Sequence, residues 1–124
     1  MIAQLNPSDF AAWREQAAAD ISAVASAALP VVLDVREPWE VQTASVKVDG
    51  FTLLCIPMRD VPARLAALLA AHGADHPIAC LCHHGMRSQQ VANYLVQNGF
   101  GEVVNLQGGI DAWSRQVDAS VARY

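Results

Sequence analysis

Short apolar runs alternate with longer amphipathic segments along the chain. A strand buried on both faces of a parallel sheet is apolar throughout and rich in β-branched and aliphatic residues. The runs that fit this pattern are residues 31–35, 51–56, 78–81 and 103–106. Between these runs, apolar residues recur with the period of a helix. The helical segments expected from this spacing begin after Asn6, after Asp60, near Ser88 and near Ile110.

Proline and glycine residues mark where the helical segments end. Pro30 closes the Ala-rich segment up to Leu29, which either prolongs the first helix or forms a second one. Gly73 and Gly99 follow later helical segments, as glycine commonly does at a helix C-terminus. Buried strands that alternate with amphipathic helices predict an α/β sandwich with a mainly parallel central sheet. Ligands of such sheets bind beyond the carboxyl ends of the strands.

Length and composition indicate one compact domain spanning residues 1–124. Of these 124 residues, 53% are hydrophobic and 16% are charged, which is enough for a hydrophobic core. The formal net charge of −4, without a cluster of lysine or arginine, argues against nucleic acid as a partner. No apolar run reaches about 18 residues, and the first residues do not resemble a signal peptide. We therefore expect no membrane partner, a cytoplasmic location and a monomer.

The segment from Cys82 to Ser88 carries the clearest candidate chemistry. Cys82 follows the apolar run 78–81, Gly85 permits a tight turn, and Arg87 opens a helical segment. At such a junction backbone N–H groups point inward, the helix N-terminus adds positive potential, and an arginine supplies a full charge. This kind of setting lowers the pKa of a cysteine thiol and makes the sulfur nucleophilic. The sequence therefore predicts a nucleophilic cysteine in an anion-binding loop.

Three segments together resemble the rhodanese-homology family of sulfurtransferases. The family's active loop, Cys-x-x-Gly-x-Arg-Ser/Thr, is matched by residues 82–88. Residues 33–40 resemble its early Asp-Val-Arg motif with a trailing glutamate, and residues 105–113 resemble its late Gly-Gly-x-x-x-Trp motif. The segments occur in the family's order and span residues 33–113, so the resemblance covers most of the chain.

The resemblance implies a rhodanese-like three-layer sandwich, with helices on both faces of the sheet, that needs no metal and no organic cofactor. Cys82 would attack the outer sulfur of a donor such as thiosulfate, and sulfite would leave a persulfide on Cys82. Backbone N–H groups would hold the terminal sulfur until a thiophilic acceptor attacks it. Donor and acceptor are small molecules or proteins. The residues expected to form this cradle are His83, His84, Gly85, Met86, Arg87 and Ser88.

Three side chains of the loop have individual expectations. Arg87 is expected to attract the anionic donor, and the Ser88 hydroxyl to be available to the sulfur. Many family members carry a basic residue directly after the cysteine, where this chain has His83 and His84. Histidine titrates near neutral pH, so an imidazolium could recruit the donor in a pH-dependent way. The alternative is that both rings only pack against the protein.

Other functions fit parts of the same pattern. Cysteine phosphatases use a similar cradle with five residues between cysteine and arginine, whereas four residues separate Cys82 from Arg87. A non-catalytic rhodanese-fold module that binds a partner or carries a persulfide is an alternative of a different class. Such modules usually lack the cysteine. Zinc binding by the cysteines and histidines of residues 80–84 is disfavoured, because such close neighbours hardly converge on one tetrahedron.

Several residues outside the loop have more than one interpretation. Asp34 and Arg36 either steady the active loop or form a structural pair at a strand end. Cys80 and Cys55 are expected in the buried core rather than as resolving thiols. The three cysteines do not form an even disulfide framework, so reduced thiols are expected. Residues 117–124 carry no motif that indicates a chemistry.

Overall fold

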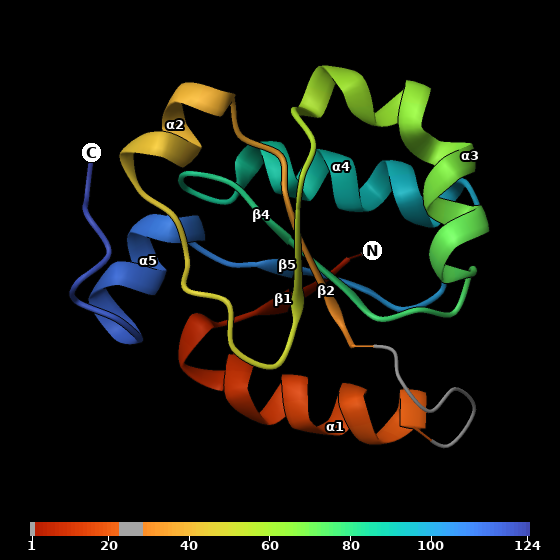
Figure 1. The fold of residues 1–124 in the computed structure, drawn as a ribbon, viewed down its shortest axis with the longest axis horizontal. Coiled ribbons are helices and arrows are strands. Elements are labelled where there is room, and N and C mark those ends of the chain that lie inside the picture. Colours follow the sequence, from red (N-terminus) through yellow and green to blue (C-terminus); the bar gives the residue numbers. More distant parts are fainter. Residues whose placement is uncertain (1, 23–28) are drawn as a thin grey trace.

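The computed structural model describes residues 2–22 and 29–124. A central sheet of five strands has the order β1-β5-β4-β2-β3, and neighbouring strands are parallel (Figure 1). The strands are β1 (Ala3–Leu5), β2 (Val31–Asp34), β3 (Thr52–Cys55), β4 (Ile78–Leu81) and β5 (Val103–Leu106). The last four coincide with the apolar runs of the sequence. β1 was not predicted, because it is a short, largely exposed edge strand that is held by pairing with β5.

Helices connect the strands. They are α1 (Phe10–Ser22), α2 (Pro38–Thr43), α3 (Val61–His72), α4 (Met86–Gln97) and α5 (Gly109–Gln116), with 3-10 turns η1 (Pro7–Asp9) and η2 (Met58–Asp60). Asn6 precedes the turn η1 rather than α1, and its side chain makes no capping hydrogen bond. The predicted continuation toward Leu29 falls on residues 23–28, which lie outside the described residues. Within residues 2–22 and 29–124, no helix has the length and hydropathy of a membrane span.

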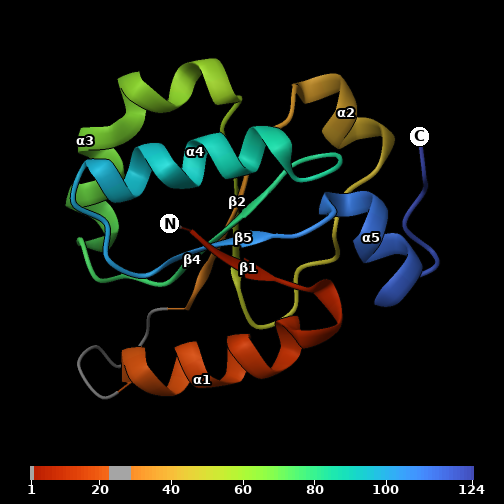
Figure 2. The same ribbon diagram turned by 180° about the vertical axis from the view of Figure 1, so that it is seen from behind.

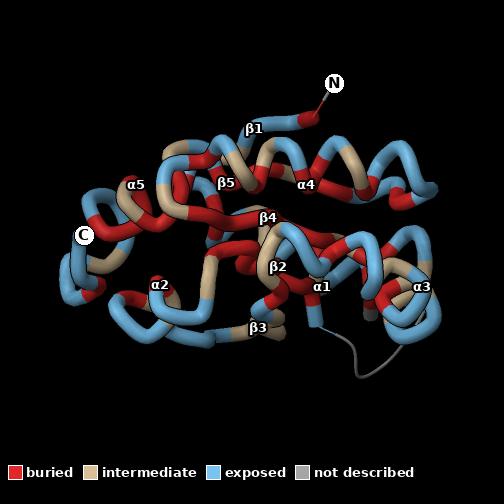
Figure 3. Tube along the Cα trace, turned by 90° about the horizontal axis from the view of Figure 1, so that it is seen from above, coloured by how far each residue is buried: buried red, intermediate tan, exposed pale blue. Residues whose placement is uncertain are grey.

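Helices cover both faces of the sheet, which confirms the predicted α/β sandwich with three layers (Figures 1 and 2). Alternate residues of each central strand point to opposite faces. Leu33 and Cys80 therefore join Leu68 of α3 and Leu95 of α4 in one buried cluster. Neighbouring strand residues join Phe10 of α1 and Trp113 of α5 in a second cluster. The central strands β2 and β4 lie buried between these layers (Figure 3).

The parallel register brings several chain segments to one edge of the sheet. Asp34 of β2 pairs with Leu81 of β4 on one side and with Cys55 of β3 on the other. Asn105 of β5 pairs with Cys80, two residues before Cys82. Residues that follow β2, β3 and β4 thus leave the sheet at the same edge. This edge is where ligands of parallel sheets bind.

Candidate active site

The sulfur of Cys82 lies at the carboxyl end of β4 and is directly hydrogen-bonded. The residue is only 1% exposed. Its Sγ accepts hydrogen bonds from the backbone N–H of Gly85 at 3.0 Å and from the Ser88 hydroxyl at 3.3 Å. Gly85 has a φ of +102°, a left-handed conformation that residues with a Cβ rarely adopt. The turn that aims this N–H at the sulfur therefore depends on glycine.

Further backbone donors lie at the start of α4. The first hydrogen bond of this helix runs from the N–H of Gln89 to the carbonyl of Gly85, at 3.2 Å. The N–H groups of residues 86–88 thus precede the intrahelical ladder, as in the first turn of any helix. Partial positive charge gathers at this helix end. Of the cradle expected from residues 83–88, the Gly85 N–H and the Ser88 hydroxyl contact the sulfur, and the N–H groups of residues 86–88 belong to the first turn of α4.

The start of α5 holds the other side of the active loop. The N–H of Ile110 donates to the carbonyl of Cys82 at 2.8 Å, and the N–H of Asp111 donates to that of His83 at 3.2 Å. This contact needs a glycine at position 109, because a Cβ there would lie 2.4 Å from the His83 carbonyl oxygen. Gly108 and Gly109 form the Gly-Gly pair of the late motif, and the sequence alone did not indicate this role.

Ser88 and Asn105 form a buried polar pair behind the sulfur. Ser88 Oγ lies 2.5 Å from Asn105 Oδ1, and Asn105 Nδ2 donates to the Gly85 carbonyl at 3.1 Å and to Gln4 Oε1 at 2.9 Å. A hydroxyl has one proton, so Ser88 can donate either to Asn105 or to Cys82 at a given moment. Negative charge on the sulfur would favour donation to Cys82. Sequence reasoning had missed Asn105 as a site residue.

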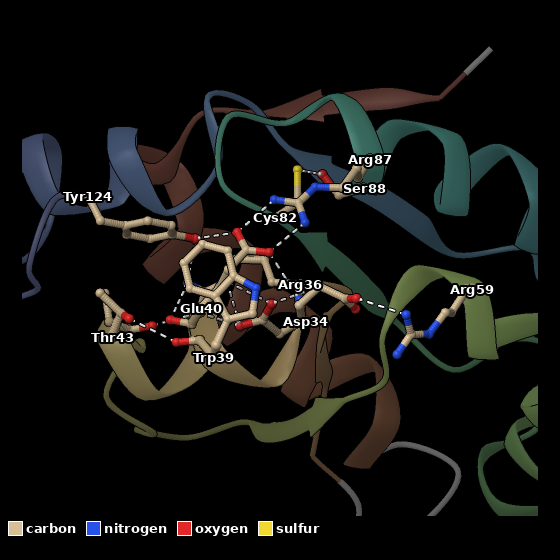
Figure 4. Close-up of polar contacts among 12 residues, drawn as sticks. Asp34, Arg36, Trp39, Glu40, Thr43, Arg59, Cys82, Arg87, Ser88 and Tyr124 are labelled. Atoms are coloured by element: carbon tan, nitrogen blue, oxygen red, sulfur yellow. Dashed lines mark hydrogen bonds and ion pairs between the residues drawn. The ribbon is translucent and has the colours of Figure 1, made fainter.

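Arg87 is paired with a carboxylate from α2. Its guanidinium makes a bidentate contact with Glu40, with N–O distances of 2.7 and 2.9 Å (Figure 4). Glu40 is buried, and Arg87 is the main cause that lowers the pKa of Glu40 from 4.5 to about 2. The same contact raises the pKa of Arg87. Glu40 therefore largely balances the positive charge that was predicted for the loop. This residue is the trailing glutamate of the early motif.

Asp34 and Arg36 form a fully buried ion pair at the end of β2. The distance from Arg36 Nη2 to Asp34 Oδ2 is 2.7 Å, and both side chains are 0% exposed. The same guanidinium donates to the carbonyls of Glu40 and Ala44 and to the Tyr124 hydroxyl, at 3.2, 2.8 and 3.0 Å. Among the described residues, these side-chain contacts link the pair to the active loop through α2 and Tyr124 rather than directly.

Three stacked rings flank the loop. His83 lies between His84 and Tyr124, with centroid distances of 3.9 Å to each ring. Burial, and then the neighbouring His84, lower the pKa of His83. Among the described residues, His83 Nε2 is buried without a hydrogen-bond partner. His84 and Met86 are exposed, and among the described residues neither side chain hydrogen-bonds the Cys82 sulfur.

The other two cysteines have different surroundings. Cys80 is 0% exposed, and burial raises its pKa to about 12. The expectation that Cys55 lies in the buried core was wrong, because this residue is exposed. Cys55 ends β3, which is an edge strand with a neighbour on one side only. In the described part of the chain, no group of three or more His, Cys, Asp or Glu residues could hold a metal ion.

Comparisons with known proteins place this architecture in a family. A chloroplastic rhodanese-like/PpiC domain-containing protein 12 of Arabidopsis thaliana is 38% identical over 75% of this chain, which spans only 30% of that protein. Thiosulfate sulfurtransferase GlpE of Pseudoalteromonas translucida is 33% identical over 75% of this chain and 81% of the relative. The crystal structure of a rhodanese-related protein from Thermoplasma volcanium has a TM-score of 0.70 at 25% identity, covering 98% of this chain and 99% of the other. The rhodanese-like domain profile matches residues 12–116, and the chain belongs to this family.

Proposed function

We propose that this protein is a sulfurtransferase that carries sulfane sulfur as a persulfide on Cys82. The observation that carries the proposal is the pair of hydrogen bonds from Gly85 N–H and the Ser88 hydroxyl to Cys82 Sγ. Two donors directed at one sulfur stabilise negative charge on it. The relatedness to a protein named thiosulfate sulfurtransferase supports the same chemistry.

The reaction proceeds in two displacements at sulfur. The Cys82 thiolate attacks the outer sulfur of thiosulfate, the sulfur–sulfur bond of the donor breaks, and sulfite leaves with the bonding electrons. The product is a Cys82 persulfide whose terminal sulfur carries the negative charge. A nucleophilic acceptor such as cyanide or a thiolate then attacks that terminal sulfur and releases the Cys82 thiolate. No external oxidant or reductant is needed.

The start of α4 supplies the stabilisation for the outer sulfur. The N–H groups of residues 86–88 have no intrahelical acceptor, since the ladder begins with the bond from Gln89 to Gly85. Preorganised donors of this kind stabilise charge as it develops and need no reorganisation during the reaction. Glu40 balances much of the positive charge of Arg87. The backbone N–H groups therefore contribute more to stabilising negative charge on the outer sulfur than the presence of an arginine in the loop suggests.

Intact-mass measurement after incubation with thiosulfate tests the proposal. We expect the mass of one added sulfur atom, lost on treatment with cyanide. Cys82→Ser should gain no sulfur, whereas Cys55→Ser, the matched control at the end of β3, should load normally. Sulfur on Cys55 instead would overturn the site assignment. A wild-type protein that gains no sulfur from thiosulfate or from glutathione persulfide would favour the binding module over the enzyme.

A further inference from the structure

The segment after α5 extends beyond the family match and returns to the active site. The rhodanese-like profile ends at residue 116, and residues 117–124 follow it. The segment is anchored by Val121, which is 5% exposed and whose carbonyl accepts a hydrogen bond from the Ser114 hydroxyl at 2.6 Å. Tyr124 is thereby brought to the edge of the active loop, next to α2 (Figure 4).

Tyr124 contacts three separate parts of the site. Its ring stacks on His83, the residue after the nucleophile, with an interplanar angle of 8°. Its hydroxyl donates to Glu40 Oε2 at 2.7 Å and accepts from Arg36 Nη1 at 3.0 Å. The ring also meets Trp39 edge-on at 6.2 Å between centroids. In the described part of the chain, no other residue contacts His83, Arg36 and Glu40 together.

The directions of these hydrogen bonds are fixed by chemistry. A guanidinium can only donate and a carboxylate can only accept, so the phenol must give its single proton to Glu40. Burial raises the pKa of Tyr124, which keeps that proton in place at neutral pH. Glu40 Oε2 therefore divides its negative charge between the Tyr124 hydroxyl and Arg87 Nη2, which lies 2.9 Å away.

We propose that Tyr124 is a positioning residue of the active site, which keeps part of the Arg87 charge available to an anionic substrate. The inference deepens the sulfurtransferase proposal and rests on it. Glu40 Oε1 also accepts from the Glu37 N–H at 3.1 Å, but Oε2 has only the Tyr124 hydroxyl and Arg87 as donors among the described residues. Without the hydroxyl, more of the carboxylate charge of Glu40 therefore falls on Arg87, and the field at Cys82 becomes less positive. Without the ring, His83 also loses the stack that supports the active loop.

Competition between two alkylating reagents tests the charge effect without requiring sulfur transfer. Iodoacetate is an anion and iodoacetamide is neutral, so the ratio of their rates at Cys82 reports positive charge near the sulfur and cancels the thiolate fraction. We expect Tyr124→Phe to lower this ratio by about two- to fivefold, as loss of a fraction of a unit charge a few ångström away would. Tyr94→Phe, the chain's other tyrosine, on α4, is the matched control and should leave the ratio unchanged.

Thiosulfate kinetics then separate the hydroxyl from the ring. Tyr124→Phe keeps the stack and should raise the KM for thiosulfate by a similar factor with little change in kcat. Tyr124→Leu should in addition lower kcat. An alkylation ratio in Tyr124→Phe equal to that of the wild type would overturn the inference, as would equal changes in the two Phe variants. If the wild type takes up no sulfur, the sulfurtransferase proposal fails, while the alkylation ratio still decides the role of Tyr124.

Discussion

The ends of β4 and β3 offer two cysteines in contrasting settings. Cys82 and Cys55 leave the same edge of the sheet and are separated by β2, whose Asp34 lies in register with both Leu81 and Cys55. Cys55 is exposed, whereas Cys82 is 1% exposed. By exposure alone, Cys55 would be the more reactive thiol.

The hydrogen bonding of the two sulfurs indicates the opposite order of reactivity. Cys82 Sγ has two donors and lies at the start of α4. Within residues 2–22 and 29–124, no donor contacts Cys55 Sγ, and desolvation together with the charge of Asp34 raises the pKa of Cys55. The difference leads us to expect that hydrogen bonding by the turn after the strand, rather than access to solvent, decides which thiol reacts.

The largest effect is expected from a substitution that displaces the turn. In Gly109→Ala, the new Cβ would lie within 2.5 Å of the Cys82 and His83 carbonyl oxygens, so the active loop must move. We expect a loss of more than about 2 kcal/mol in the free energy of unfolding and a fall of about 100-fold in sulfur loading. Denaturant titration and single-turnover loading would measure both.

Gly73→Ala is the matched control for this substitution. Gly73 also has a positive φ, of +86°, but a Cβ there would meet no atom within 4 Å. Gly73 has a ψ of 160°, in a region that is nearly exclusive to glycine, so we expect backbone strain of about 1–3 kcal/mol and unchanged sulfur loading. Equal sulfur loading in Gly109→Ala and Gly73→Ala would contradict the inference that the start of α5 supports the active loop.

The second prediction compares the two thiols directly. At neutral pH, iodoacetamide should modify Cys82 at least about tenfold faster than Cys55, because positive potential at a helix N-terminus favours the reactive thiolate. Peptide mapping after brief labelling would measure both rates in one sample. Faster labelling of Cys55 would mean that exposure decides reactivity here.

The third prediction concerns the pH dependence of the Glu40–Arg87 pair. The folded-state pKa of Glu40, about 2, lies below its ordinary value of 4.5, so its stabilisation is complete above about pH 4.5 and is lost as the pH falls toward 2. Glu40→Gln should therefore cost on the order of 2–3 kcal/mol at pH 7, and the difference from wild type should shrink in acid. Urea titrations at pH 7 and pH 3 would show this.

Glu15→Gln provides the control, since this glutamate is exposed on α1. It should be nearly neutral at both pH values, as surface substitutions usually are. A destabilisation of Glu40→Gln that is the same at pH 7 and pH 3 would contradict the ionic origin of the effect.

The fourth prediction concerns the Ser88 hydroxyl. Ser88→Ala removes one donor from the sulfur and leaves Asn105 Oδ1 without this partner, which should cost about 1–2 kcal/mol of stability. Loading should slow several-fold, less than in Arg87→Ala, because the backbone donors survive. His76→Ala, which loses a hydrogen bond to the Leu29 carbonyl at the other end of β4, should lose stability without slower sulfur loading. Identical sulfur loading in the Ser88 and His76 variants would remove Ser88 from the mechanism.

The smallest effect on the KM for thiosulfate at pH 7 is expected at the two histidines. Since burial lowers the pKa of His83, its ring is neutral at pH 7 and stacks between two other rings. Replacing His83 and His84 together by glutamine should change the KM for thiosulfate less than about twofold at pH 7, with a rise only well below the ordinary imidazole pKa of about 6.5. A large rise in KM at pH 7 would instead support a charged loop.

Much of the fold could be predicted from local patterns. The strands β2 to β5 are continuous apolar runs, and the helices α3 and α4 follow from helical periodicity with glycine after their last turns. The edge strand β1 and the short helix α2 were not predicted, although Pro38 and the contact of the Glu37 N–H with the Glu40 side chain are local features of the start of α2. β1 is held by hydrogen bonds to β5, and α2 by contacts of Glu40 with other segments. Such contacts leave no periodicity in the sequence.

The sequence by itself determined the chemistry-bearing loop, because a cysteine at a strand end, a glycine and a helix start are local features encoded within residues 82–88. Only the tertiary structure decided how that loop is charged and supported. Arg87 contacts Glu40, which is 47 positions away in the sequence, and Tyr124 contacts the same residue from a separation of 84 positions. Parallel strands carry their following residues to one edge whatever their separation along the chain, so these partners become neighbours only when the sheet forms.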